Sequence, residues 1–466
     1  MSETTAPIRL FDRALRRITG VWSGMAASVT SDGDDSIATQ MRACLDGPGG
    51  EISARNRAAK LAAEYLTLTE AGRTNFLKTL ASFDSSVAEV TAAYDRLQAA
   101  AADPAERATA TAALRRALEP PRMRLLTQFT TIPDGMKFLV DLRATLLSRV
   151  KGDPYLAALD SDLRALLANW FDVGFLELKR IDWNSPAVLL ERLVGYEAVH
   201  EIRSWSDLKN RLDSDRRCYA LFHPRMPNEP LIFVEVALVK GLAVSVQRLL
   251  DKKAPLLDGK DADTAIFYSI SNCQKGLAGI SFGNFLIKRA VIEVGAEYRH
   301  IKQFATLSPM PGFRKWLDAM LKDHAPLLSS DETAALTAAL PLGDRADPSN
   351  PILTAILHRR GWSRDPAIVK VVEPVLVRLG ARYLLMESRG QRALDPVAHF
   401  HLSNGARVER ISMLADTSEK GVKESATLMV NYVYDPAKLE EYHEDYAGSG
   451  KRNATTAVRR LARGIS

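Results

Sequence analysis

The pattern of apolar residues changes near Trp170, and this change limits the folds that the chain can adopt. From about Ile52 to Asn169, apolar residues recur every three or four positions in stretches rich in Ala, Leu, Arg and Glu, which is typical of amphipathic helices. No β-branched run of strand length intervenes, so we predict an all-helical scaffold or oligomerisation domain over residues 1–170. Pro and Gly predict breaks between its helices at 46–50, 119–122, 133–135 and 152–154.

Beyond Trp170, short β-branched and aromatic runs alternate with helical patterns, which predicts a mixed α/β domain over residues 171–466. The Asn-Gly pair in SNGA, at 403–406, is typical of a hairpin between two alternating strands, so we expect antiparallel pairing there. Pro, Gly and Asp at 340–351 predict a loop. The expected strands lie in the runs RRCYALFHP, PLIFVEVALV, TAIFYSIS, AHFHLSNGARVERISMLAD and SATLMVNYVYD.

Composition excludes several classes of protein. The 466 residues are 46% hydrophobic and 25% charged, which is the balance of a soluble globular protein. The three cysteines lie far apart without CxxC spacing, so we expect a reducing compartment and neither zinc nor a redox pair. No apolar stretch is long enough to span a membrane, and neither a signal core nor a C-terminal SKL address is found. The N-terminal arginines fit an amphipathic transit peptide, which Glu3 and Asp12 disfavour, so we expect a cytoplasmic protein.

The net charge of +6 comes mostly from one segment. Residues 451–466 contain five basic side chains and no acid. A mild positive excess suits an anionic partner, but no nucleic-acid-binding motif accompanies it, and we expect no nucleic-acid partner. The role of this basic tail stays open.

A glycine-rich turn is the first candidate for a binding site. In TAIFYSIS-NCQKGLAGISFGN-FLIKRAVIEV, a predicted strand leads through Gly276, Gly279 and Gly283 into a predicted helix. Backbone N–H groups and the positive end of the helix dipole can together hold a pyrophosphate. The spacing is neither that of a Walker loop nor GxGxxG, so a purely structural turn fits the pattern equally well.

Three further motifs offer reactive side chains. Ser308 in LSPMPGF lies at a turn stiffened by two prolines, which can aim its hydroxyl at a substrate or serve only as a turn or cap. His399 and His401 alternate along a predicted strand and would therefore share a face. No acidic or histidine residues accompany them at the spacing of metal ligands, so we favour proton transfer by one histidine over metal binding by both. Tyr432 and Tyr434 also share a predicted strand face, either to donate to a substrate oxygen or simply to pack.

In these residues the sequence resembles the malonyl-CoA decarboxylase family. Six of the family's motifs occur in the family's order from about Trp170 onward, whereas the helical first third matches in character more than in motif. The motifs are HPRMPNEPLIFVEVAL, AIFYSIS, GNFLIKR, LSPMPGF-KW, ALDPVAHFHLSNGA and LMVNYVYD.

The resemblance implies an α+β multidomain protein, with a helical self-association domain followed by a catalytic domain of the N-acetyltransferase (GNAT) superfold. It implies a carboxy-lyase (EC 4.1.1.9) of fatty acid metabolism that converts malonyl-CoA to acetyl-CoA and CO2. It also implies no metal and no cofactor beyond the CoA of the substrate. The implied partners are malonyl-CoA, acetyl-CoA and further copies of the chain, as a dimer or tetramer.

The resemblance also assigns site residues. The family's proton-accepting serine falls on Ser308 and its proton-donating histidine on His401, whereas His399 is expected to be structural. The CoA-binding positions are Ala278, Gly279, Ile280, Ser281, Phe282, Gly283, Asn284, Ser308, His401 and Tyr434.

Two other functions remain open on sequence grounds. The first is a CoA-dependent acyltransferase, although Ala278 and Ser281 depart from the pyrophosphate signature of that superfold while Gly283 matches it. The second is a non-catalytic CoA-binding sensor whose helical third is the working part.

Overall fold

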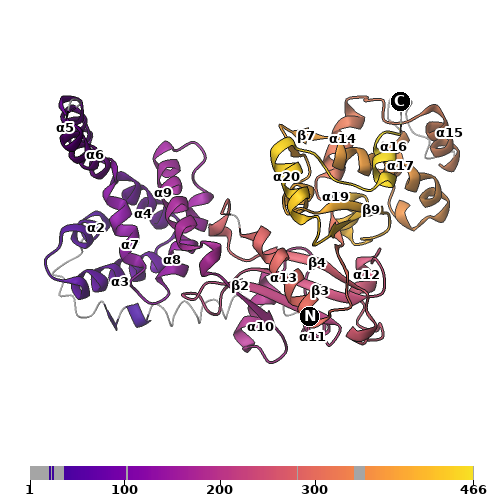
Figure 1. Cartoon of the computed structure of the whole chain (residues 1–466), viewed down its shortest axis with the longest axis horizontal. Helices are drawn as coiled ribbons and strands as arrows, with labels where there is room; N and C mark the ends of the chain where they lie inside the picture. Colours follow the sequence, from indigo (N-terminus) through magenta and orange to yellow (C-terminus); the bar gives the residue numbers. More distant parts are fainter. Residues whose placement is uncertain are drawn as a thin grey trace. The chain divides into compact units, whose positions relative to one another are not determined.

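The computed structural model describes residues 20–22, 24–25, 36–100, 103–280, 282–340 and 352–464. The chain divides into two compact units (Figure 1). Unit 1 comprises Met1–Glu177, Phe222–Leu231 and Asn272–Ser281, and unit 2 comprises Leu178–Leu221, Ile232–Ser271 and Phe282–Ser466, as far as these ranges are described. Residues 341–351 of the predicted loop at 340–351 lie outside the described residues, and the predicted domain boundary at residue 170 stays a proposal.

Unit 1 is helical, as predicted, and the part of it described between residues 36 and 170 contains no strand. The predicted breaks lie at helix ends, and at two of them Pro121 and Pro154 begin the next helix, because the N–H that proline lacks has no partner in a first turn. The helices are α2 (Ile37–Asp46), α3 (Glu51–Thr67), α4 (Glu70–Ser82), α5 (Val87–Ala99), α6 (Pro104–Leu118), α7 (Pro121–Phe129), α8 (Gly135–Leu147) and α9 (Pro154–Trp170).

Four aromatic rings form part of the core of unit 1. Tyr65 packs edge-on against Phe76 and Phe138, with ring centroids 4.8 and 5.5 Å apart, and Phe129 lies 4.9 Å from Phe138. All four side chains are buried, so α3, α4, α7 and α8 are joined by one apolar cluster.

Unit 2 contains most of a mixed sheet, which has eight strands in the described residues, in the order β1-β2-β3-β4-β5-β10-β6 with β9 also paired to β10. β4 and β5 are parallel and α13 crosses between them, whereas β10 is antiparallel to β5, β6 and β9. This arrangement confirms the predicted mixed α/β domain. The strands are β1 (Glu177–Ile181), β2 (Arg216–Phe222), β3 (Pro230–Val239), β4 (Thr264–Asn272), β5 (Gln303–Thr306), β6 (Ser308–Pro309), β9 (Arg407–Ser412) and β10 (Met429–Tyr434).

Unit 2 also contains most of the remaining described helices. They are α10 (Ala187–Tyr196), α11 (Trp205–Arg211), α12 (Val246–Leu249), α13 (Gly283–Glu297), α14 (Phe313–Lys322), α15 (Ser330–Ala339), α16 (Ile352–His358), α17 (Pro366–Leu385), α18 (Pro396–Ser403), α19 (Glu419–Ser425), α20 (Leu439–Ser449) and α21 (Thr456–Ala462). A two-stranded sheet pairs β7 (Ser388–Arg389) with β8 (Arg392–Ala393). None of the described helices has the length and apolar character needed to cross a membrane.

One predicted strand is wrong. The segment AHFHLS belongs to helix α18, which begins because the Asp395 side chain accepts from the first N–H groups and Pro396 occupies the first turn. Asn404 then caps the helix, and Gly405 follows with a φ of 79°, so the Asn-Gly pair ends a helix instead of forming a hairpin. The expected hairpin is therefore absent from this described segment, and β9, the strand after the turn, pairs antiparallel with β10 instead.

Much of the basic tail is folded. α21 packs against α17, with Val458 buried, while Arg459 and Arg460 are exposed. Arg452 donates to the Leu384 carbonyl oxygen at 3.2 Å, and Ala454 bridges to Val408 of β9. The described part of the tail is therefore held on unit 2 by apolar and backbone contacts.

Candidate active site

The structure brings Ser308 and His401 together, although they are 93 positions apart in the sequence. Ser308 Oγ lies 2.9 Å from Nε2 of His401. Ser308 is the first residue of β6, and His401 lies in the last turn of α18. Both are almost fully buried, with exposed fractions of 6% and 2%. A hydroxyl and an imidazole in hydrogen-bond contact, largely shielded from water, can bind an anionic group and move a proton.

Ser308 is fixed by its position between two strands. The preceding residue, Leu307, donates its N–H to the Phe267 carbonyl oxygen at 3.0 Å, which continues the pairing of β5 with β4. Ser308 itself pairs with Val430 of β10. Met310 then donates its N–H to Ser425 Oγ at 3.2 Å, so the proline-rich turn is tied to α19. The predicted rigid strand-to-turn setting of Ser308 is confirmed.

Thr306 accepts a hydrogen bond from the Ser308 hydroxyl, a contact that the sequence did not predict. Ser308 donates to Thr306 Oγ1 at 2.9 Å, and that oxygen also accepts the Tyr432 N–H at 3.2 Å. Because the Ser308 proton points to Thr306, Ser308 Oγ is the acceptor in its contact with His401. Residues two apart in an extended strand point to the same face, so the spacing of Thr306 and Ser308 could have predicted this contact.

The two predicted tyrosines both contact the imidazole. The Tyr434 hydroxyl lies 2.7 Å from Nδ1 of His401, and the Tyr432 ring stacks on it with centroids 4.5 Å apart. Burial raises the pKa of Tyr434 well above its usual value, so this phenol stays protonated and donates to Nδ1. The ring proton of neutral His401 therefore sits on Nε2, directed at Ser308.

Burial also lowers the pKa of His401 to about 3. Without a nearby negative charge, the imidazole is neutral at physiological pH, because the cation would lose its hydration in this site.

His399 takes no part in this arrangement. Its Nδ1 lies 2.8 Å from the Tyr446 hydroxyl. The expectation that His399 and His401 share a face is wrong, since residues two apart point about 200° apart around a helix instead of to one side of a strand.

The glycine-rich turn has the predicted strand, turn and helix order, with β4 leading through the turn into α13. Gly276 serves packing, because a Cβ there would overlap the Val140 carbonyl oxygen of α8. Gly279 has a φ of 79°, a left-handed conformation that favours glycine. Gly283 begins α13 after Phe282, and Ser281 lies outside the described residues.

An arginine of α8 shapes the same turn within unit 1. Arg143 donates to the carbonyl oxygens of Gly276 and Ala278 at 2.7 and 2.9 Å, and pairs with Asp160 at 2.8 Å. The N–H groups of Ala278 and Ile280 donate within the turn, to Lys275 and Leu277. Any ligand held by backbone N–H groups here must therefore use other positions of the turn.

Comparisons with known proteins agree on one family. The model of the malonyl-CoA decarboxylase C-terminal domain matches residues 174–465, and that of its N-terminal domain matches residues 56–171. The chain belongs to the malonyl-CoA decarboxylase family. This is a family of carboxy-lyases.

Relatives and solved structures of this family align with much of the chain. Malonyl-CoA decarboxylase, mitochondrial, from Rattus norvegicus is 35% identical over 74% of this chain and 72% of its own length. The protein of that name from Anser anser anser is 39% identical over 67% of this chain and 64% of its own length, which is less than two thirds of that relative. The word mitochondrial describes those relatives, and a cytoplasmic location of this chain stays a prediction.

Crystal structures of malonyl-CoA decarboxylases resemble the fold closely. The protein from Rhodopseudomonas palustris is 40% identical with a TM-score of 0.81, covering 91% of this chain and 98% of that one. The protein from Agrobacterium vitis is 38% identical with the same TM-score, covering 91% and 99%.

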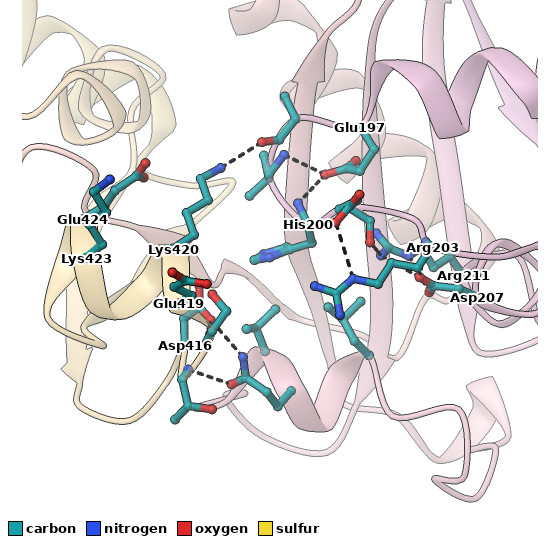
Figure 2. Close-up of a pocket in the computed structure, with 18 of the residues that line it drawn as sticks. Glu197, His200, Arg203, Asp207, Arg211, Asp416, Glu419, Lys420, Lys423 and Glu424 are labelled. Carbon is teal, nitrogen blue, oxygen red and sulfur yellow. Dashed lines mark hydrogen bonds and ion pairs between the residues drawn. The ribbon is translucent and has the colours of Figure 1, made fainter. Parts of the chain in front are cut away.

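Unit 2 also contains a polar cavity of about 1120 Å³, shown in Figure 2. Neither Ser308 nor His401 lines it. Glu197 organises one wall by accepting the N–H groups of Val199 and His200 at 2.9 and 2.7 Å, and Lys420 reaches across to the Ala198 carbonyl oxygen at 3.0 Å. These contacts hold the walls of the cavity together.

No group of three or more His, Cys, Asp or Glu side chains in the described parts of the chain is arranged to hold a metal ion. The sequence did not predict the contact of Thr306 with Ser308. It also did not predict that the Asp395 side chain accepts the Tyr383 hydroxyl and the Gly312 N–H. The Asp-Pro pair before HFH, a common helix start, was the signal that could have placed His401 on a helix.

Proposed function

We propose that this protein decarboxylates malonyl-CoA to acetyl-CoA and CO2, with Ser308 and His401 as the reacting pair. The observation that carries the proposal is the 2.9 Å contact between Ser308 Oγ and His401 Nε2 in a site that is almost closed to water. Membership of the decarboxylase family supplies the substrate and the class of reaction.

The reaction has two chemical requirements. When the bond from C2 to the carboxyl carbon breaks, CO2 leaves and the electron pair remains on C2, spread into the thioester oxygen as an enolate. A proton must then reach C2, so one proton is consumed from solvent for each malonyl group. Positioned donors to a developing oxyanion supply about 3 to 4 kcal/mol each, and a positioned acid a factor of about 100 to 10,000.

Ser308 positions the carboxylate in this proposal. When the malonyl group binds, its carboxylate draws the Ser308 hydroxyl away from Thr306, which retains the Tyr432 N–H as a partner. The hydrogen bond holds the carboxylate out of the thioester plane, so that the breaking bond overlaps the carbonyl system.

His401 delivers the proton, and its burial keeps the imidazole neutral until the substrate binds. A neutral imidazole whose pKa is about 3 holds an extra proton only when a negative charge lies beside it. The bound malonyl carboxylate supplies that charge and raises the pKa of His401. The extra proton of the imidazolium lies on Nδ1, where the Tyr434 hydroxyl turns to accept it. Once CO2 has left, the negative charge passes to the enolate, and the Nε2–H protonates C2. The neutral ring then keeps its proton on Nδ1 until proton exchange with solvent restores the Nε2–H form.

The CoA part of the substrate is assigned to the turn from Ala278 to Asn284, and no further cofactor is required. The left-handed Gly279 and the N-terminus of α13 support this assignment, since helix N-termini favour phosphate. Tyr434 is assigned to the site because its hydroxyl contacts Nδ1 of His401.

We also propose that residues 1–170 mediate self-association into a dimer or tetramer. α5 and α6 pack against each other, and Figure 1 shows them extending from the rest of unit 1. They expose Val87, Tyr94 and Leu118, with exposed fractions of 82%, 50% and 53%. Light scattering of a V87S/Y94S variant should give a smaller mass than the unaltered protein.

One assay tests the reaction itself. Purified protein mixed with malonyl-CoA alone should release CO2 and form acetyl-CoA in equal amounts. An acyltransferase would leave malonyl-CoA intact until an acceptor was added, and a sensor would bind CoA without turnover.

A further inference from the structure

The side chain of Asp395 connects the two segments that carry Ser308 and His401. Asp395 Oδ1 accepts the N–H groups of Val397 and Ala398, both at 2.9 Å, and so starts helix α18. Asp395 Oδ2 accepts the Tyr383 hydroxyl at 3.2 Å and, more weakly, the Gly312 N–H at 3.4 Å. Gly312 ends the proline-rich turn that begins at Ser308.

The surroundings of Asp395 leave little freedom for either segment. Asp395 has no exposed surface, and a Cβ at Gly312 would overlap the Tyr383 hydroxyl. Phe313, the next residue, packs on the Tyr383 ring with centroids 5.7 Å apart, and Trp316 does so at 5.2 Å. The turn after Ser308, helix α17 and helix α18 therefore meet at one buried carboxylate.

Other Asp-Pro helix starts in the chain show what is particular to Asp395. Asp153 accepts two N–H groups of α9, and Asp365 accepts two of α17, with Pro154 and Pro366 in the first turns. The second oxygen of Asp365 meets Arg359 at 3.3 Å near the surface. Only at Asp395, among these three, does the second oxygen accept from a buried tyrosine and a second backbone segment.

We infer that Asp395 is a positioning residue that sets the contact between Ser308 and His401. This inference rests on the proposed function of that pair. The carboxylate fixes the start of α18, whose last turn holds His401, and the end of the turn that Ser308 begins. Loss of the Asp395 contact with α18 or with Gly312 would let the Ser308 hydroxyl and the imidazole move apart. We therefore expect a large decrease in kcat and a small change in KM.

The first test replaces one carboxylate oxygen. In D395N, the amide oxygen can still cap α18, but the NH2 group faces Tyr383 and leaves the Gly312 N–H without its acceptor. We expect kcat to fall by about 10- to 100-fold with KM changed less than about threefold, because displacements near 1 Å cost that much in oriented reactions. The matched control D153N, at a helix start of unit 1, should retain kcat within about twofold. An unchanged kcat in D395N would overturn the inference.

A double variant separates positioning from a merely structural role. If Asp395 acts through the pair, D395N should lower kcat little further in a protein that already carries H401N. Equal fold-losses in the presence and absence of His401 would show that Asp395 supports the fold only. The thermal midpoint of each variant, measured beside kcat, shows that the proteins are folded at the assay temperature.

Y383F provides a second route if D395N does not fold. It removes one donor to Asp395 and keeps the carboxylate, so kcat should fall by about 3- to 10-fold and again not additively with H401N. A wild-type kcat in Y383F would then overturn the inference. These outcomes differ from failure of the proposed function, in which the unaltered protein would release no CO2 from malonyl-CoA.

Discussion

The Tyr434 hydroxyl lies 2.7 Å from Nδ1 of His401, and it determines which ring nitrogen carries the proton. Because the phenol donates to Nδ1, the imidazole proton is on Nε2 and faces Ser308. The hydroxyls and the ring form one directional series of donors, from Tyr434 through His401 and Ser308 to Thr306.

Replacing this tyrosine should therefore affect turnover. Y434F removes the donor to Nδ1 and frees His401 to adopt the other tautomer, so we expect kcat to fall by about 10-fold or more with KM little changed. Y432F is the matched control, since Tyr432 is equally buried and stacks on the same ring, but its hydroxyl has no hydrogen-bond partner among the residues that the structure describes. It should keep kcat within about threefold and lose no stability. Equal losses in both variants would assign the effect to ring packing.

Stability should depend on pH through His401. In the unfolded chain this group binds a proton near pH 6.5, whereas in the folded protein burial lowers its pKa to about 3. Between these values the unfolded state binds more protons, so acidification destabilises the fold and the stabilisation is complete only above pH 6.5. Urea unfolding from pH 7 to 5 should show wild-type stability falling more steeply than that of H401N, by a slope that approaches about 1.4 kcal/mol per pH unit. Parallel curves would contradict a buried neutral imidazole.

Substrate binding should take up a proton. A thioether analogue that keeps the carboxylate but lacks the thioester carbonyl cannot lose CO2, yet its charge should raise the pKa of His401 as malonyl-CoA does. Calorimetry in buffers of different ionisation enthalpy should detect uptake approaching about one proton per site in the wild type and near none in H401N. The same uptake in both proteins would place the transferred proton elsewhere.

Two glycines of the turn should respond differently to alanine. G279A puts a Cβ on a left-handed backbone, which costs about 1 kcal/mol locally, and it should raise KM several-fold with kcat nearly unchanged, because the CoA contacts are shared by ground and transition states. G276A overlaps the Val140 carbonyl oxygen, so its main effect should be a lower thermal midpoint. An unchanged KM in G279A would remove the turn from the CoA site.

Much of this organisation follows from local sequence physics. Helical periodicity and the Pro and Gly breaks predicted the helices of unit 1, because each amphipathic helix carries its own pattern. The β-branched runs around Phe267 and Tyr432 predicted β4 and β10, and their alternation predicted that Tyr432 and Tyr434 share a face. The approach of both rings to His401 depends on packing between segments far apart in the chain, which periodicity does not encode.

The segment around His401 shows where local reasoning fails. Alternating His399 and His401 and an Asn-Gly pair favoured a strand and hairpin, but the Asp395 cap and Pro396 begin a helix there. A start signal six residues upstream therefore outweighed the alternation. The family resemblance assigned a role to His401 without revealing that Thr306 contacts Ser308, or that Asp395 contacts Tyr383, Gly312 and the start of α18.

Paired action of Ser308 and His401 in decarboxylation should appear in kcat for CO2 release from malonyl-CoA. S308A and H401N should each lower kcat by at least about 100-fold with modest change in KM, and the double variant should lose little more than either single one. Near-normal turnover in both single variants would contradict this paired action.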